Sequence, residues 1–174
     1  ICTPLVRDSG IITAFNALKV VCERGARVTL TVCGKGPSDQ VASMRSFVIE
    51  HRLPVEFVNL APRSRELYQL FRDSDVFLRT EEWDEPCVTT PLEAMASGQA
   101  VIATSAGAGA ELLRHGVNAL VFGAGDFATL AELMLAVIGD PALRHRLAAA
   151  GQTEVVARYN EVAVADQIED FLKE

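Results

Sequence analysis

The chain has 174 residues, and its 16 Lys and Arg against 23 Asp and Glu give a formal net charge of −7. This length predicts a single domain over residues 1–174 that can bury its own core. A content of 49% hydrophobic and 22% charged residues excludes a disordered chain. The acidic balance argues against nucleic acid as a partner. No membrane contact is evident either, because no apolar run reaches the roughly 18 residues of a membrane span.

The cysteines indicate the cellular compartment of the protein, and the first residue indicates whether the sequence is a fragment. No CxxC pair and no histidine at metal-ligand spacing occurs among Cys2, Cys22, Cys33 and Cys87. We therefore expect reduced thiols and a cytoplasmic protein. The sequence starts on Ile1 and runs directly into an apolar segment, so we expect it to be a piece excised from a larger protein.

Short apolar runs alternate with helical patterns along the chain. The runs predict strands at residues 1–5, 28–33, 55–60, 76–78, 100–104 and 119–122. The helices between and after them are predicted to begin near Ile11, Ser38, Ser64, Pro91, Asp126 and Asp140. The serines and aspartates of this set can cap their helices. A last amphipathic segment carries Val164, Ile168, Phe171 and Leu172.

This alternation predicts the fold class. Hydrophobic strands separated by helices indicate an α/β fold, a Rossmann-like three-layer sandwich in which a parallel sheet has helices on both faces. Ligands of such sheets bind beyond the carboxyl ends of the strands. We therefore expect the site in the loops after Leu5, Cys33, Leu60, Leu78 and Thr104.

The densest group of candidate residues spans 80–95, where a predicted strand ends and a helix begins. The backbone N–H groups of Val88, Thr89 and Thr90 would point out of that helix start. A helix start of this kind attracts an anion such as phosphate.

Two glutamates in this region have a structural alternative. Glu93 completes a capping box with Thr90, and without further context capping is the favoured interpretation. For Glu85 the alternative is a solvated carboxylate in an acidic loop.

Two further loops lie at the same predicted edge. Gly34, Lys35 and Gly36 follow a strand but lack the spacing of a Walker loop or of GxGxxG, so alone they indicate a turn. The small-residue loop 105–111 is either a place where a ligand approaches the backbone or a flexible connection. The sequence has no Ser-His-Asp or Cys-His arrangement and no DxD-like carboxylate pair after a strand, so we predict no metal.

Several of these residues form ordered motifs of a known family. Glu85-Pro86 followed by residues 92–98 (LEAMASG) and 100–104 (AVIAT) resembles the EPFG…LEAMA.G.PVIAT sequence of the family 4 retaining glycosyltransferases. Glu85 and Glu93 have the offset of that family's EX7E motif. Residues 34–37 resemble its GxGP, 67–78 its LY..ADVFL and 111–121 its ELL.DGVNGLLV. The resemblance covers nearly the whole chain.

The resemblance implies the C-terminal, donor-binding half of a GT-B enzyme, a hexosyltransferase in carbohydrate biosynthesis. The implied partners are a nucleotide-diphosphate sugar as substrate and an N-terminal acceptor-binding domain of the same protein, with no cofactor and no metal. Glu85 would be the catalytic residue, in contact with hydroxyls of the donor sugar, and Glu93 would accept hydrogen bonds from the ribose. The implied donor-binding residues are Gly34, Lys35, Gly36, Val88, Thr89, Thr90 and Glu93.

The sequence departs from the family pattern at the two positions where the family has cationic side chains that bind the diphosphate. Thr3 stands where an Arg is usual, and Asp8 or Ser9 stands where a Lys is usual. Arg7 or Lys35 would have to compensate. The usual Phe-Gly after Glu-Pro is replaced by Cys87-Val88.

These departures keep a second class of function open, a degenerate, non-catalytic module that binds a partner. A GT-B sugar epimerase is disfavoured because no histidine-rich site occurs. An NAD-dependent dehydrogenase is disfavoured because the first strand lacks a glycine fingerprint.

Overall fold

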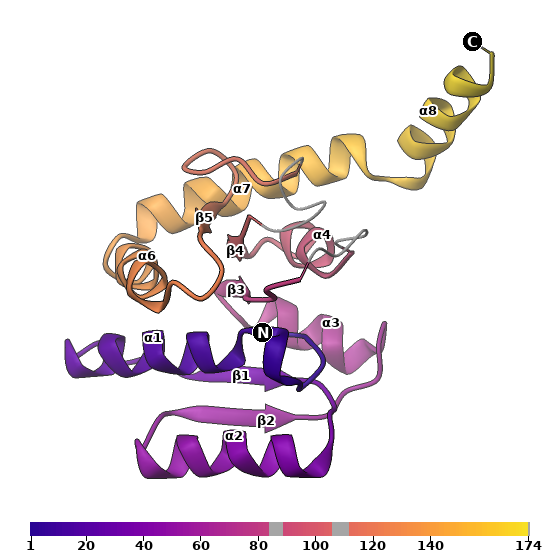
Figure 1. Cartoon of the computed structure of the whole chain (residues 1–174). Coiled ribbons are helices and arrows are strands. Elements are labelled where there is room, and N and C mark those ends of the chain that lie inside the picture. Colours follow the sequence, from indigo (N-terminus) through magenta and orange to yellow (C-terminus); the bar gives the residue numbers. More distant parts are fainter. Residues whose placement is uncertain (84–88, 106–111, 174) are drawn as a thin grey trace.

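The computed structural model describes residues 1–83, 89–105 and 112–173, and it shows parallel strands in two groups with helices around them (Figure 1). In the first group β1 (Leu30–Cys33) pairs with β2 (Val55–Val58). The second group has the order β3-β4-β5, with β3 (Val76–Arg79), β4 (Ala100–Thr104) and β5 (Leu120–Phe122). The pairings between these strands are all parallel, as the sequence predicts.

The helices follow the strands in the predicted alternation. The first three are η1 (Arg7–Ser9, a 3-10 turn), α1 (Ile11–Glu23) and α2 (Ser38–Glu50). The others in the described ranges are α3 (Arg65–Arg72), α4 (Thr89–Ala96), α6 (Phe127–Gly139), α7 (Pro141–Arg158) and α8 (Glu161–Lys173).

Strand β4 shows why its sequence is apolar at every position. Ala100 and Ile102 pack in a hydrophobic cluster with residues of α1 and α6. Val101 and Ala103 pack in a second cluster with residues of α3, α4 and α7. Successive side chains of a strand point to opposite faces, so both faces of the sheet are covered by helices. The predicted three-layer, Rossmann-like fold class is therefore confirmed.

The first predicted strand, residues 1–5, is wrong as a regular strand. Only an isolated parallel bridge joins Cys2 to Cys33. The segment is still extended beside β1, because the N–H of Thr3 donates to the carbonyl of Cys33 at 3.1 Å and the N–H of Leu5 to that of Lys35 at 2.8 Å. Its pairing is one-sided, since a cavity rather than β3 borders part of its other side.

Most predicted helix caps are confirmed. Ser64 accepts from the N–H of Leu67 at 3.2 Å, and Asp126 and Asp140 cap α6 and α7 in the same way, at 3.0 Å each. Ser38 is not a cap, because Pro37 occupies that position and α2 makes no side-chain capping bond.

The start of α4 also differs from the prediction. The helix begins at Thr89, so Thr90 lies inside it and is not its N-cap, and Pro91 is not the first helical residue. Pro91 is accommodated because the first turn of a helix has no internal N–H bond to lose.

The last helix, α8, extends away from the rest of the molecule (Figure 1) and has no buried residue. Its apolar side chains remain exposed, with Phe171 and Leu172 each 76% exposed. The amphipathic pattern thus predicts the helix correctly, but its apolar face is not packed within residues 1–83, 89–105 and 112–173. In that part of the chain, no helix is both long and apolar enough to cross a membrane.

Candidate functional site

The segment that follows β3 is hydrogen-bonded to the last residue of β4 and to η1 at the carboxyl ends of the strands. The hydroxyl of Thr104, the last residue of β4, donates to the carbonyl of Glu81 at 2.8 Å. The hydroxyl of Thr80 donates to the carbonyl of Ser9 at 2.8 Å, and the N–H of Glu82 donates to that of Asp8 at 3.2 Å. This carboxyl edge of the sheet is therefore a single hydrogen-bonded platform.

The loop at Gly34–Gly36 closes onto the N-terminal segment at the same edge. A Cβ added to Gly34 would lie 2.0 Å from the carbonyl oxygen of Thr3, and one added to Gly36 would lie 2.0 Å from that of Leu5. Only glycine permits such an approach of two backbones. Lys35 between them is exposed, so the loop holds a cation at the carboxyl edge, as predicted.

Glu93 lies in the middle of α4 and is half-buried. Burial raises the pKa of its carboxyl group, and the positive charge of Arg63 opposes that rise. Its charge also contributes to raising the pKa of Cys2, so Glu93 lies close to the N-terminal segment. The structure thus brings Glu93 close to Arg63 and to the N-terminal segment at Cys2.

The remaining residues of α4 anchor the helix. Pro91, Ala94 and Met95 are buried, whereas Thr89 is exposed and Thr90 half-buried. The two predicted threonines therefore lie at the accessible start of the helix. A helix start favours negatively charged groups.

Cys2, in the segment beside β1, is not poised for nucleophilic chemistry. Burial and the neighbouring thiol of Cys33 raise the pKa of Cys2 to about 12. The thiolate is the reactive form of cysteine, so Cys2 is a structural residue.

The sequence analysis missed a buried cation under the carboxyl edge. Arg79 ends β3 and is 1% exposed. Its Nη1 donates to the hydroxyl of Thr104 at 3.1 Å, and its Nε lies 3.7 Å from a carboxylate oxygen of the buried Glu81. The signal was an arginine directly after an apolar strand and followed by Thr-Glu, the polar partners that a buried guanidinium requires.

Arg63 was missed as well. It lies in the loop before α3 with a left-handed backbone, at φ 57°, and its charge reaches Glu93. A non-glycine residue in that conformation is uncommon, and sequence alone gives no sign of it.

The cation positions of the family pattern hold other side chains. Thr3 and Ser9 are buried, and the hydroxyl of Ser9 donates to the carbonyl of Val6 at 2.6 Å. Arg7, the predicted compensating residue, is exposed in η1. Arg7 in η1 and the loop residues Lys35 and Arg63 are thus cations at or next to this edge.

Some predictions fall outside the described residues. These are Glu85, Cys87 and Val88, of which the last two stand in place of the family's Phe-Gly, and loop residues 106–111. Within the ranges that the structure describes, no three His, Cys, Asp or Glu side chains gather to hold a metal ion.

A family profile and several known proteins match the chain. Residues 4–154 match the family described as glycosyl transferases group 1. The chain belongs to this family. It is 32% identical, over 159 residues, to the phosphatidyl-myo-inositol mannosyltransferase of Mycobacterium leprae, covering 91% of this chain and 41% of that protein. The chain therefore spans about two fifths of the length of that relative.

Solved structures show the same fold. Anabaena Alr3699/HepE in complex with UDP-glucose has a TM-score of 0.85 and 25% identity, covering 99% of this chain and 47% of that one. The C-terminal domain of the group 1 glycosyl transferase LpcC from Francisella tularensis has a TM-score of 0.80 and 25% identity. It covers 90% of this chain and 83% of that one.

Proposed function

We propose that this chain is the C-terminal, donor-binding half of a family 4 retaining glycosyltransferase of GT-B architecture. It would bind a nucleotide-diphosphate sugar and transfer the hexosyl group to an acceptor held mainly by an N-terminal domain of the same protein. The proposed setting is carbohydrate biosynthesis in the cytoplasm. Membership of the group 1 family and the UDP-glucose complex of HepE support this proposal.

The observation that carries the proposal is the position of Glu93. Glu93 lies within α4, one turn from its start, and its half-buried carboxyl group is within reach of the charge of Arg63. Such a group can accept hydrogen bonds from ribose hydroxyls while the N–H groups at the helix start face a diphosphate. Hydrogen bonds to a charged acceptor are the stronger class.

The neighbouring loops supply the rest of the proposed donor site. Gly34 and Gly36 hold Lys35 at the carboxyl edge, and Thr89 and Thr90 line the start of α4. Fixed amide dipoles stabilise the charge that develops on a leaving diphosphate, so we propose transfer without a metal or a cofactor. Val88 would join the diphosphate contacts, and Glu85 would be the catalytic residue on the donor sugar.

Calorimetric titration with UDP, GDP and ADP tests the binding part of the proposal. We expect one of the three to bind and Glu93→Gln to weaken it about tenfold or more. The matched control is Glu50→Gln, which changes an exposed glutamate at the end of α2 and should leave binding unchanged. Binding of none of the three nucleotides would contradict the proposal.

The second candidate is a non-catalytic binding module. It is favoured because the buried Thr3 stands where the family has Arg, and the exposed Asp8 or the buried Ser9 stands where the family has Lys. Glycosyl transfer by the full-length protein separates the two candidates. A catalytic Glu85 predicts a large loss of activity in Glu85→Gln, and unchanged activity in that variant would remove Glu85 from the mechanism.

A further inference from the structure

Arg63 lies in a tight turn between β2 and α3, at the carboxyl edge of the sheet (Figure 1). The N–H of Ser64 donates to the carbonyl of Ala61 at 3.2 Å and closes the turn. Pro62 is then the second residue of the turn and Arg63 the third. A positive φ in the third position is typical of a type II turn, where glycine or asparagine is usual. Arg63 has φ 57°, so an arginine is kept here against a backbone preference for glycine.

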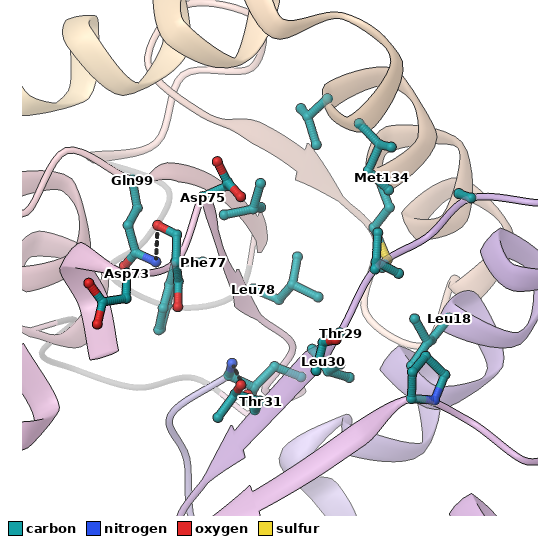
Figure 2. Close-up of a pocket in the computed structure, with 18 of the residues that line it drawn as sticks. Leu18, Thr29, Leu30, Thr31, Asp73, Asp75, Phe77, Leu78, Gln99 and Met134 are labelled. Carbon is teal, nitrogen blue, oxygen red and sulfur yellow. Dashed lines mark hydrogen bonds between the residues drawn. The ribbon is translucent and has the colours of Figure 1, made fainter. Parts of the chain in front are cut away.

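A second arginine has the same left-handed backbone, so this conformation does not by itself mark a binding residue. Arg52 has φ 51° between α2 and β2, and it is exposed as Arg63 is. It borders a cavity of about 950 Å³ that is also lined by Asp75 and Gln99, the residues before β3 and β4 (Figure 2). Arg52 therefore lies at the amino edge of the sheet, opposite the proposed donor site. What distinguishes Arg63 is its surroundings.

The turn of Arg63 is held beside α4 by apolar packing. Leu60, three residues earlier, and Leu92, next to Glu93, pack against the same hydrophobic cluster. The positive charge of Arg63 accordingly acts on the carboxyl group of Glu93. The N–H of Gly34 also donates to the last residue of β2 at 3.3 Å. The segment that carries Arg63 thus leaves the sheet beside the Gly34 loop, between two elements of the proposed donor site.

The guanidinium of Arg63 is accessible to a ligand. In the part of the chain that the structure describes, it makes no hydrogen bond or ion pair. A guanidinium carries five N–H donors and no acceptor, so a group that it recognises must supply acceptor atoms. In the proposed function the diphosphate would lie at the start of α4 and the ribose at Glu93, one turn along the helix. The part of the nucleotide still without a side-chain partner is its base.

Given the function proposed above, in which Glu93 holds the ribose, we propose that Arg63 selects the nucleobase of the donor by donating to a carbonyl oxygen of that base. Uracil O4 and guanine O6 are such oxygens. Cytosine and adenine carry an amino group in the corresponding place, and its N–H donors would face those of the guanidinium. The site is therefore specific for a uridine or a guanosine nucleotide.

Calorimetric titration of the full chain with UDP, CDP, GDP and ADP tests the role of Arg63. These nucleotides form two matched pairs, because UDP and CDP differ in the group at position 4 of the pyrimidine, and GDP and ADP in that at position 6 of the purine. The variant is Arg63→Gly, which removes the guanidinium and suits the positive φ, so it should fold at least as well as the original chain. The matched control is Arg52→Gly, the same exchange at φ 51° on the opposite edge.

We expect the original chain to bind the carbonyl-bearing member of one pair about tenfold or more tighter than the amino-bearing member. The pair that shows this preference distinguishes uracil from guanine. Arg63→Gly should abolish the preference, and Arg52→Gly should retain it. An effect of Arg63 only through the charge of Glu93 would weaken all four nucleotides alike and leave the preference unchanged.

Three results would overturn the role of Arg63 while leaving the proposed function in place. These are equal binding within both pairs, an unchanged preference in Arg63→Gly, and an equal loss for all four nucleotides in that variant. The last result would show that the guanidinium contacts the diphosphate or acts only through Glu93. Binding of none of the four nucleotides would instead contradict the proposed function itself, and the role of Arg63 with it.

Discussion

Arg79 and Thr104 join the ends of two neighbouring parallel strands inside the protein, through a hydrogen bond of 3.1 Å from the guanidinium to the hydroxyl. The same guanidinium pairs with Glu81, whose side chain is 8% exposed. Thr104 in turn donates to the backbone of Glu81. The platform beneath the proposed donor site is thus built around a buried ion pair.

Replacing Arg79 should therefore destabilise the protein strongly. Arg79→Met leaves the buried carboxylate of Glu81 without this cation, and breaking a buried pair in this way costs about 3 kcal/mol or more. Denaturation in urea measures the change in unfolding free energy. The double variant Arg79→Met/Glu81→Gln should recover much of the loss, since no buried charge is then uncompensated. A neutral Arg79→Met would show that the pair does not support the platform.

The Gly34 loop should not tolerate a side chain. A Cβ at this position would lie 2.0 Å from the carbonyl oxygen of Thr3, so Gly34→Ala must displace one of two backbones, which typically costs about 1–3 kcal/mol. The control is Gly139→Ala, because nothing lies within 4 Å of a Cβ there. Thermal unfolding of the two variants should separate them clearly. Equal melting temperatures would contradict the close approach.

The carboxyl group of Glu93 should make stability fall as the pH rises. Because burial raises its pKa in the folded state, folded protein holds this proton to higher pH than the unfolded chain does. Its contribution to stability is then complete below the unfolded pKa and is lost as the pH rises through the folded pKa. The stability of Glu93→Gln relative to the original protein should therefore increase as the pH rises above about 4.3, the pKa of a free glutamate, measured by urea denaturation.

The control for this titration is Arg63→Gln. Arg63 lowers the pKa of Glu93, so its removal should raise that pKa further and enlarge the pH dependence. If the original protein and Glu93→Gln keep a constant difference in stability over this range, the half-buried carboxyl group is not titrating as the geometry requires.

Cys2 should resist alkylation in the folded protein. With its pKa raised to about 12, almost none of the thiol is ionised at about pH 8, whereas a free cysteine with a pKa of about 8.5 is partly ionised. Labelling with iodoacetamide followed by peptide mass mapping should show Cys2 unmodified in native protein and modified in urea. Rapid labelling of Cys2 in the native protein would show that its thiol is neither buried nor held beside Cys33.

Local signals in the sequence were sufficient for much of the fold. The apolar run of β4 and the capping residue Ser64 each encode their element within a few positions, and both elements form as predicted. The N-terminal segment failed as a regular strand because its ladder with β1 is reduced to one bridge, between Cys2 and Cys33, after which its N–H bonds go to the Gly34 loop at Lys35.

The site was predictable only in part for a similar reason. The resemblance of residues 34–37 to GxGP indicated the Gly34 loop, and the EX7E resemblance indicated Glu93. The burial of Arg79 depends on Thr104, which is 25 positions away in the sequence, and the approach of Arg63 to Glu93 depends on a loop conformation. Neither contact has a local pattern that would identify it.

The central claim is that the start of α4 and the Gly34 loop bind the nucleotide of a donor sugar. Amide NMR spectra recorded during titration with UDP, GDP and ADP test this claim most directly. We predict that one nucleotide shifts the signals of residues 34–36 and 89–93 in a saturable way. Unchanged signals in both segments with all three nucleotides would contradict the account.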